Sequence, residues 1–438
     1  MNNNNVTDKL GIQLNEMQKA TEEAILYTGK DVVVMSPTGS GKTYAYLLPL
    51  IQRLNTNSDD LQAVVLLPGR ELALQSAMVL KDMGSGLRAM ALYGGRPTMD
   101  EHRVLRDVKP HIVFVTPGRL NDHLDKKNLN AETIKWLVID EFDKCLELGF
   151  QGEMMSILNK LPNIERRILL SATESESIPA FVSMGRTIYL DYRTDDDNIP
   201  DRVHLYTVKS PEKDKLDSLK RLLLSLGNES TIVFLNYRES VERVATFLKE
   251  NDFIVSWYHG GLEQDEREAA LYRFSNGSVS ILISTDLASR GLDIPDVDNI
   301  IHYHISETED NYIHRVGRTA RWDKEGRTFF ILGPGETLPE YVSKDNEEFQ
   351  LPTNLPKPSL PRMATIYIGK GKKDKISKID IVGFLCKKIG LQSSEIGKID
   401  IKDRYCYVAI DRTKVKKVIL ASKGQKIKGI KTIVEEVR

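Results

Sequence analysis

The stretch DVVVMSPTGSGKT, from Asp31 to Thr43, joins a short apolar run to a glycine-rich turn and the expected start of a helix. An apolar run without polar alternation predicts a strand that is buried on both faces, as in a parallel sheet covered by helices. In the turn, Gly39 and Gly41 allow backbone N–H groups to converge on an anion, and the dipole of the following helix adds positive potential there. This stretch therefore predicts an α/β domain with a phosphate-binding loop.

Similar runs recur along the chain and alternate with amphipathic helical stretches. The first series comprises Asp31–Met35, Ala63–Leu67, His111–Val115, Trp136–Ile139 and Ile168–Leu170. The second series comprises Thr231–Leu235, Ile254–Trp257, Ser280–Ser284, Ile300–Tyr303 and Thr328–Leu332. Because strands spaced by helices form parallel sheets, the two series predict two doubly wound α/β domains in tandem, at residues 1–197 and 198–345.

A smaller third domain is expected at residues 362–438, after a proline-containing, semi-extended linker at residues 346–361. Its pattern has the order strand, helix, strand, strand, helix, strand, at Ala364–Ile368, Ile379–Ile389, Lys398–Ile401, Tyr405–Ile410, Thr413–Ala421 and Ile430–Glu435. RNA-recognition modules with a ferredoxin-like fold use this order, so we predict a small α+β, RRM-like domain.

Charge also separates this C-terminal tail from the rest of the chain. The whole chain has 61 Lys+Arg and 62 Asp+Glu, for a net charge of −1. From Arg362 onward there are about 20 basic and about 8 acidic residues, which leaves roughly −13 on the remainder. A basic appendage on an acidic body is typical of a nucleic-acid anchor, although a solvated lysine-rich face would give the same count.

Composition excludes several other classes of protein. The chain is 41% hydrophobic and 28% charged, and it contains no apolar run long enough to span a bilayer. The N-terminus lacks the pattern of a signal peptide. Three scattered cysteines, Cys145, Cys386 and Cys406, show no metal-ligand spacing. We expect a cytoplasmic, monomeric protein without structural disulfides or zinc.

The glycine-rich turn carries the residue types that nucleoside triphosphates require. Lys42 would reach the β- and γ-phosphates, and the Thr43 hydroxyl would bind Mg²⁺. Ser36 stands where the pattern usually has its first glycine, and taken alone such a segment can be an ordinary turn. The residues expected to contact the nucleotide are Ser36, Thr38, Gly39, Ser40, Gly41, Lys42 and Thr43.

An acidic motif, IDEFD from Ile139 to Asp143, follows a later strand of the same predicted sheet. Ligands collect at the carboxyl ends of strands in open α/β sheets. Asp140 can hold Mg²⁺ through its water shell, and Glu141 can orient or deprotonate an attacking water. An acidic first turn of a helix would look the same in isolation, but here a phosphate loop precedes it.

Further motifs follow in order. In the first domain they are SPTGSGKT, PGREL (Pro68–Leu72), YGG (Tyr93–Gly95), TPGR (Thr116–Arg119), DEFD and SAT (Ser171–Thr173). In the second they are HGGLEQDER (His259–Arg267), STDLASRGLDI (Ser284–Ile294) and YIHRVGRTAR (Tyr312–Arg321). Together they resemble the DEAD-box family of superfamily-two RNA helicases over roughly residues 10 to 335, which implies two RecA-like domains.

The resemblance implies ATP and Mg²⁺ as cofactors in a site split between the domains. By their match to the family's motifs, Gln18 would read the adenine and Asp293 would bind the ribose. Arg318 and Arg321 would neutralise the γ-phosphoryl group. Asp140, Glu141 and Lys42 complete the catalytic set. The residues that couple hydrolysis to domain closure would be Asp143, Ser171, Thr173 and His314. Since neither domain holds every group, hydrolysis is expected to wait for closure.

The resemblance also implies that RNA binds across both domains and favours closure. The matching positions are Arg70, Gly95, Thr116 and Arg119 in the first domain and Gln264, Arg267 and Thr285 in the second. Most would contact phosphates or ribose hydroxyls, so the core would not read sequence. The bent strand would leave its A-form duplex, which gives local strand separation.

Four positions depart from the family pattern. Phe142 replaces the alanine of the eponymous tetrapeptide, a position without a nucleotide contact, so activity should survive. Gly69 replaces a threonine and removes a hydroxyl that could bind RNA phosphate. Glu16 replaces the proline two residues before Gln18, so we expect adenine recognition that is weaker or supported by other contacts. His304 stands where an aspartate is common, and the sequence gives it no mechanistic role.

Residues 362–438 resemble the RNA-binding domain of DbpA-type DEAD-box helicases. The resemblance lies in GKGKKDKIS (Gly369–Ser377), DIVGFL (Asp380–Leu385), EIGKIDIKD (Glu395–Asp403) and KIKG (Lys426–Gly429). It implies that the domain holds a hairpin of large-subunit ribosomal RNA during ribosome assembly. The lysines expected to bind phosphates are Lys370, Lys372, Lys373, Lys426 and Lys428.

Three tyrosines of the tail are candidates for base stacking. Strand alternation places Tyr405 and Tyr407 on one sheet face, and Tyr367 lies on another strand. A role in the core is an equal alternative for one of them.

An ATP-dependent RNA helicase is the leading hypothesis for the whole chain. A DNA-directed translocase of the same superfamily is one alternative, and ATPase stimulation by RNA but not DNA would exclude it. A non-catalytic, ATP-gated RNA clamp is another, and the presence of Lys42, Glu141, Arg318 and Arg321 argues against it.

Overall fold

The computed structural model describes residues 11–437 except 12, 38, 96–97, 174–177, 194–201, 289–293, 295–296, 321–323 and 343–344. Three predicted site residues, Thr38, Asp293 and Arg321, therefore lie outside the described residues. The chain divides into two compact units, one built from residues 1–198 and the other mostly from residues 199–438. Of the helices in the described part, none is long and apolar enough to cross a membrane.

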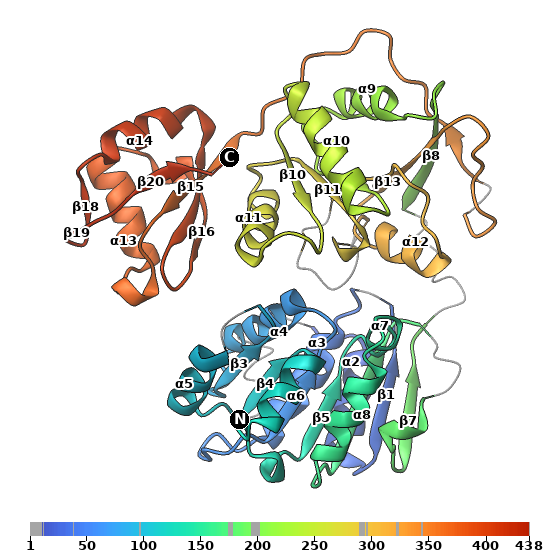
Figure 1. Ribbon diagram of the computed structural model, residues 1–438, viewed down its shortest axis with the longest axis vertical. Helices are drawn as coiled ribbons and strands as arrows, with labels where there is room; N and C mark the ends of the chain where they lie inside the picture. The colour runs from blue at the N-terminus through green and yellow to red at the C-terminus, as the bar shows by residue number, and fades with distance from the viewer. Residues whose placement is uncertain are drawn as a thin grey trace. The chain divides into compact units, whose positions relative to one another are not determined.

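The first unit contains a seven-stranded parallel sheet in the order β3-β4-β2-β5-β6-β1-β7 (Figure 1). Its strands are β1 (Asp31–Met35), β2 (Ala63–Leu66), β3 (Ala89–Leu92), β4 (Ile112–Val115), β5 (Trp136–Ile139), β6 (Arg166–Ser171) and β7 (Thr187–Asp191). The strands β3 and β7 were not among the predicted runs. Both lie at sheet edges, where most of their residues are only partly buried and the apolar signal is weak.

Strand alternation explains how helices cover both faces of this sheet. Val32 and Val34 of β1 enter one core, whereas Val33 enters the core on the opposite face. The first face packs against α2 (Glu16–Tyr27), α3 (Lys42–Arg53) and α4 (Arg70–Asp82). The second packs against α5 (Thr98–Val108), α6 (Pro117–Asp125), α7 (Phe142–Glu147) and α8 (Gln151–Lys160).

The second unit holds another seven-stranded parallel sheet, in the order β10-β11-β9-β12-β13-β8-β14. Its strands are β8 (Val203–Lys209), β9 (Thr231–Phe234), β10 (Val255–Tyr258), β11 (Ile281–Ser284), β12 (Asn299–His302), β13 (Gly326–Leu332) and β14 (Glu347–Glu348). Its main helices are α9 (Leu216–Leu226), α10 (Arg238–Glu250), α11 (Gln264–Ser275) and α12 (Glu309–Val316). The prediction of two tandem doubly wound domains is confirmed.

The start of the segment that was predicted as a linker contacts the second sheet. The strand β14 pairs with β8, and the next residues, Phe349 and Leu351, pack against the core of the second sheet. These apolar side chains fasten the start of the segment to the sheet edge, so it is not a free spacer there.

The tail forms an antiparallel sheet in the order β16-β17-β15-β20, with two helices on one face, as predicted. Its elements are β15 (Met363–Ile368), α13 (Lys378–Gly383) with a π-helical continuation to Ile389, β16 (Ile396–Ile401), β17 (Cys406–Asp411), α14 (Val415–Ser422) and β20 (Val434–Glu436). The final strand was predicted at Ile430–Glu435, but the observed strand β20 begins only at Val434. Residues Lys426–Ile427 (β18) and Ile430–Lys431 (β19) form a hairpin instead, because Lys428 and Gly429 both adopt positive φ in a tight two-residue turn.

Candidate nucleotide site and RNA-binding surfaces

The phosphate loop lies between β1 and α3, where the sequence predicted it. Gly39 and Gly41 have φ of 86° and 88°, a conformation that suits glycine. The carbonyl oxygen of Gly41 accepts a hydrogen bond from Gln18 Nε2 at 3.2 Å. Because a Cβ on Gly41 would collide with the Gln18 amide, the second glycine is also needed for this close approach.

Lys42 is the first residue of α3, and its side chain folds back over the loop. Its Nζ donates to the carbonyl oxygens of Ser36 at 2.7 Å and Pro37 at 3.1 Å, and the residue is only 6% exposed. An ammonium group held in this way can exchange carbonyl partners for phosphate oxygens. Thr43 follows in the first turn of α3 and is partly buried.

Gln18 is positioned by a residue that the sequence analysis missed. The Asn15 side chain caps α2, and Gln18 returns a hydrogen bond to the Asn15 backbone in a capping box. The Asn15 amide also donates to the carbonyl of Ser40 at 2.9 Å. The pair therefore ties the start of α2 to the phosphate loop. The spacing Asn15-x-x-Gln18 was the signal that could have identified it.

Asp140 directly follows β5 and is buried in the first unit. Burial and the neighbouring Glu141 raise its pKa to about 7, whereas Lys42 acts in the opposite direction. Its Oδ1 accepts the N–H of Glu141 at 3.0 Å, and the buried Tyr46, which sequence reasoning missed, lies close by. A desolvated carboxyl group of this kind fits a divalent cation, since a bound cation would favour the ionised form.

Glu141 combines a strained backbone with an unused carboxylate oxygen. Its φ of 52° is left-handed, a conformation that non-glycine residues adopt mainly where the surrounding structure imposes it. The Oε2 atom is buried without a hydrogen-bond partner in the described part of the chain. A water held by this oxygen would satisfy it, which fits the predicted water-orienting role.

The coupling residues of the first unit form one hydrogen-bonded group. Asp143 Oδ2 accepts from the N–H groups of Ala172 and Thr173, at 3.2 and 3.0 Å, and from the Thr173 hydroxyl at 2.9 Å. The Ser171 hydroxyl donates to the Thr173 carbonyl at 2.8 Å, and the Ser171 carbonyl accepts the N–H of Ser36. The SAT segment is therefore bonded to both the acidic motif and the phosphate loop.

Phe142 has a structural explanation. It begins α7 and is buried in the core that α6 and α8 share with the sheet. Its side chain is therefore a packing residue, in agreement with the expectation that it does not contact nucleotide.

The predicted RNA contacts of the first unit follow neighbouring strands. Arg70, Gly95 and Thr116 come after β2, β3 and β4, whose carboxyl ends are adjacent. Gly95 has φ of 95°, and an added Cβ would lie 2.7 Å from Arg70 Nη1, so the guanidinium rests against this glycine.

Arg119 is anchored by an acidic residue that sequence reasoning did not single out. Its Nε donates to Glu101 Oε2 at 2.7 Å, and His123 Nε2 lies 3.1 Å from the same oxygen. Although burial raises it, the hydrogen bonds from His123 and Arg119 hold the pKa of Glu101 below its ordinary value. The ionised Glu101 fixes the Arg119 guanidinium at the start of α6.

The predicted RNA contacts of the second unit gather around Tyr258. Gln264 and Arg267 lie in the first turn of α11, and Arg267 Nη2 donates to the Tyr258 hydroxyl at 3.2 Å. Thr285 donates its N–H to the Tyr258 carbonyl at 3.4 Å. Tyr258 was not predicted; its position at the carboxyl end of β10 was the available signal.

His314 and Arg318 are both buried, with exposures of 1% and 2%, and His314 Nε2 lies 3.3 Å from Asp310 Oδ1. Between them in the sequence, Arg315 donates to Asp286 Oδ2 at 3.0 Å and to Asn236 Oδ1 at 2.8 Å. These two partners place Arg315 as the anchor of this segment.

His304 takes part in the same structure. Its Nδ1 accepts the N–H of Asn236 at 3.2 Å, and its carbonyl accepts from Arg315 at 2.8 Å. Burial, with Lys215 and Arg315, lowers its pKa to about 4, so the ring is neutral near pH 7. Where an aspartate is common, His304 thus supplies a neutral hydrogen-bond acceptor close to Lys215 and Arg315.

The two lysine groups of the tail converge. Lys372 and Lys373 lie in an exposed turn, and Lys426 and Lys428 lie in the β18–β19 hairpin. Lys428 Nζ donates to the Lys375 carbonyl at 2.9 Å, which brings the hairpin against that turn. Lys428 Nζ also lies 3.4 Å from Asp380 Oδ2, and the fifth predicted lysine, Lys370, pairs with Asp374 at 3.1 Å.

The tail tyrosines lie together, but one is covered. The rings of Tyr405 and Tyr407 are 5.0 Å apart, and Tyr367 is 6.1 Å from Tyr407. The ring of Tyr407 stacks on Tyr272 of α11 at 5.3 Å, and Tyr407 is only 7% exposed. The Tyr272 hydroxyl donates to the Tyr407 and Lys398 carbonyls at 3.0 and 2.6 Å. Base stacking on Tyr407 would therefore require the tail sheet to leave α11.

Three known protein families match consecutive parts of the chain. Residues 15–181 match the DEAD/DEAH box helicase family, residues 214–323 the helicase conserved C-terminal domain, and residues 365–436 the DbpA RNA binding domain. The chain is 34% identical over 427 residues to the ATP-dependent RNA helicase DbpA of Escherichia coli (strain K12), covering 95% of this chain and 93% of that protein.

Other similar proteins share less of the chain. Identity is 33% over 315 residues to the DEAD-box ATP-dependent RNA helicase CshA of Bacillus anthracis, covering 70% of this chain and 59% of the relative. The S. cerevisiae Dbp5 structure bound to RNA and ADP BeF3 has a TM-score of 0.67 at 25% identity and covers 76% of this chain and 87% of that one. The Mss116p structure bound to ssRNA and AMP-PNP has a TM-score of 0.71 at 24% identity, with coverage of 80% and 77%, and shows likeness of fold. This chain therefore belongs to the DEAD-box family of ATP-dependent RNA helicases and carries a DbpA-type RNA-binding domain.

Proposed function

We propose that this helicase acts as a monomer on large-subunit ribosomal RNA during ribosome assembly, and that the tail selects the RNA. The observation that carries the proposal is the convergence of exposed lysines from two turns of the tail, held by the contact of Lys428 with the Lys375 carbonyl. Converging cations bind the phosphates of a folded RNA better than scattered ones. The match to the DbpA RNA binding domain over residues 365–436 supports the same assignment.

At the nucleotide site, residues of the first domain hold ATP. The loop N–H groups and Lys42 bind the phosphates, and Gln18 reads the adenine. Asp140 and Thr43 would hold Mg²⁺, which supplies charge neutralisation at the phosphates. Glu141 orients the attacking water and accepts its proton through the carboxylate oxygen that has no other partner among the described residues.

The remaining groups come from the second domain. Arg318 and Arg321 neutralise the γ-phosphoryl group, and Asp293 binds the ribose. RNA that binds Arg70, Gly95, Thr116 and Arg119 together with Gln264, Arg267 and Thr285 favours closure, so RNA and ATP strengthen each other's binding. The Asp143–Thr173 hydrogen bonds and His314 link closure to hydrolysis.

The test compares RNA-stimulated ATPase rates of two full-length variants. In the first, Lys372, Lys373, Lys426 and Lys428 are all changed to Gln. In the matched control, Lys387, Lys416, Lys417 and Lys423, exposed or partly exposed lysines of the same domain, are changed to Gln. Both variants lose the same charge, but the control leaves the converged lysine group unchanged.

The first variant is expected to need at least about tenfold more ribosomal RNA fragment for half-maximal stimulation, while unrelated RNA is affected less. The control should behave like the unmodified chain, and single-stranded DNA should stimulate none of them. Equal loss in both variants, or equal stimulation of the unmodified chain by ribosomal and unrelated RNA, would contradict the proposal. Point substitutions are preferable to removal of residues 362–438, which would uncover Tyr272.

A further inference from the structure

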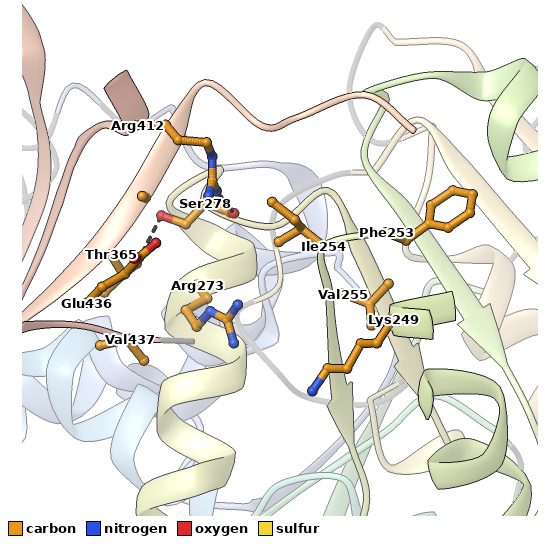
Figure 2. A pocket seen from close by; sticks show the side chains of 11 residues that line it. Lys249, Phe253, Ile254, Val255, Arg273, Ser278, Thr365, Arg412, Glu436 and Val437 are labelled. Atoms are coloured by element: carbon orange, nitrogen blue, oxygen red, sulfur yellow. Dashed lines mark hydrogen bonds between the residues drawn. The ribbon is translucent and has the colours of Figure 1, made fainter. Parts of the chain in front are cut away.

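A cavity of about 310 Å³ lies within the second unit, between the second helicase sheet and the tail (Figure 2). The helicase side contributes Lys249 from the end of α10 and Arg273 from the last turn of α11. The tail contributes Arg412 and Glu436. The walls also include apolar side chains, among them Phe253 and Val255, so the cavity has both a charged and an apolar side.

The charged side is strongly unbalanced. Three cationic side chains line the cavity, and Glu436 is the single acidic one among its described lining residues. Arg412 donates to the carbonyl oxygens of Pro361, Met363 and Ser278, at 2.6, 2.7 and 2.8 Å. Because these acceptors are neutral, they fix the guanidinium without cancelling its charge.

Arg273 has the least compensated charge. Its guanidinium makes neither a hydrogen bond nor an ion pair with any residue that the structure describes. Burial and the adjacent Arg412 lower its pKa to about 10, while Glu436 acts in the opposite direction. Glu436 can offset only part of the charge of the three cations, so an anion from outside the chain would stabilise this partly buried arrangement.

Lys249 can add a third positive group. Its Nζ lies 3.8 Å from the centroid of the Trp257 ring, and burial and Arg273 lower its pKa. In Figure 2, Arg273 lies between Arg412 and Lys249 on the charged side of the cavity. The long lysine side chain is exposed and can therefore move from the ring to an anion.

We propose that this cavity binds a phosphate group through Arg273, with Arg412 and Lys249 as supporting cations, and that the phosphate belongs to the RNA backbone. The arginine fork matches phosphate oxygens in pairs. Arg273 lies six residues beyond Arg267 on α11, about 9 Å along the helix axis, so a strand held at the start of the helix can reach its end. A free phosphate-bearing molecule offers the same chemistry and is the second possible source.

The first experiment measures binding of single-stranded RNA to the full-length chain by fluorescence anisotropy at several salt concentrations. Arg273→Gln is expected to weaken binding five- to twentyfold and to lower the slope of log affinity against log salt by about 0.7, the value for one phosphate on a single strand. The control is Arg243→Gln, an exposed arginine of α10 that pairs with Asp214, which should leave the slope unchanged.

Further measurements distinguish RNA from a free phosphate-bearing molecule as the source of the phosphate, and further variants control for misfolding. Pyrophosphate binding is measured by calorimetry in Lys42→Gln, which weakens the ATP site, and in Lys42→Gln with Arg273→Gln. An unchanged RNA slope together with lost pyrophosphate binding would overturn RNA as the source and keep the phosphate site. Arg273→Lys should retain most of the slope, and exposed Lys249→Gln should lower it even if Arg273→Gln fails to fold. No change in either ligand would overturn the proposal. The inference requires RNA binding but not a ribosomal target, so its failure leaves the proposed function untouched.

Discussion

The nucleotide site of the first domain and the lysine surface of the tail, both proposed to bind phosphate groups, are built in opposite ways. In the first, Lys42 and Asp140 are almost fully buried, and the site residues are joined by short hydrogen bonds. In the second, Lys372, Lys373 and Lys426 are exposed on two turns. We therefore expect the first site to fix a phosphate by geometry and the second to attract phosphates by charge.

The two regions should therefore differ in the substitutions that they tolerate. Hydrolysis needs a water and a phosphorus atom at defined positions, so a small displacement or a single lost group is severe. Electrostatic binding of RNA is a sum over several phosphates, so each lysine contributes a part. Substitutions should therefore give an all-or-none response in the first region and a graded response in the second.

The largest expected effect is that of Glu141→Gln. The amide keeps the shape of the side chain but cannot accept a proton, so RNA-stimulated ATP turnover should fall at least about 100-fold. The dissociation constants for RNA and for a non-hydrolysable ATP analogue, measured by fluorescence, should stay within about threefold of those of the unmodified chain. Glu147→Gln, an exposed residue on the same helix, serves as the control. Unchanged turnover in Glu141→Gln would remove this residue from the water-orienting role.

A single substitution in the lysine surface should have an intermediate effect. Lys372→Gln removes one exposed cation, so affinity for a ribosomal RNA fragment should fall about three- to fivefold, with a loss of about 0.7 to 0.9 in the salt slope. The maximal ATPase rate at saturating RNA should not change. Lys416→Gln is the matched control. A loss as large as that of the fourfold variant would mean that the surface is as cooperative as the nucleotide site.

The smallest effect concerns Gly69, which precedes α4 in an extended conformation with φ of −134°. A Cβ at this position would meet its nearest atom, Glu71 Oε2, at 3.9 Å, which is ordinary van der Waals contact. Gly69→Thr restores a hydroxyl that can donate to an RNA phosphate and should raise RNA affinity about twofold to fivefold. Gly69→Val, with the same shape but no hydroxyl, should not. Equal affinities of the two variants would show that the hydroxyl does not reach the RNA.

The comparison also explains how much the sequence could predict. The phosphate loop and the acidic motif are contiguous strings whose neighbours in sequence are neighbours in space, so Lys42, Asp140 and Glu141 could be proposed as site residues directly from the sequence. Asn15, Tyr46 and Tyr258 were missed because their roles depend on contacts with residues from other elements. The linear pattern could mark Asn15 as a helix cap and Tyr258 as the end of a strand, but it does not show the contacts that bring either residue into a site.

The tail was predicted less well for the same reason. The order of its elements was correct, but the predicted final strand included Ile430 and Lys431, which belong to the β18–β19 hairpin, because Lys428 is not a residue that usually marks a turn. The apolar residues Phe349 and Leu351 were placed in a linker, since only the sheet edge beside them reveals what they cover. The sequence around Tyr272 does not indicate that this residue contacts the tail, because the contact is with Tyr407, which is far away in the sequence.

Tyr272 has one more consequence. It belongs to the same helix as Gln264 and Arg267, and its hydroxyl holds two backbone carbonyls of the tail. If the tail holds one element of the RNA and α11 contacts the strand, as proposed above, this junction and not the length of the connecting segment would set the distance between the two bound parts of the RNA.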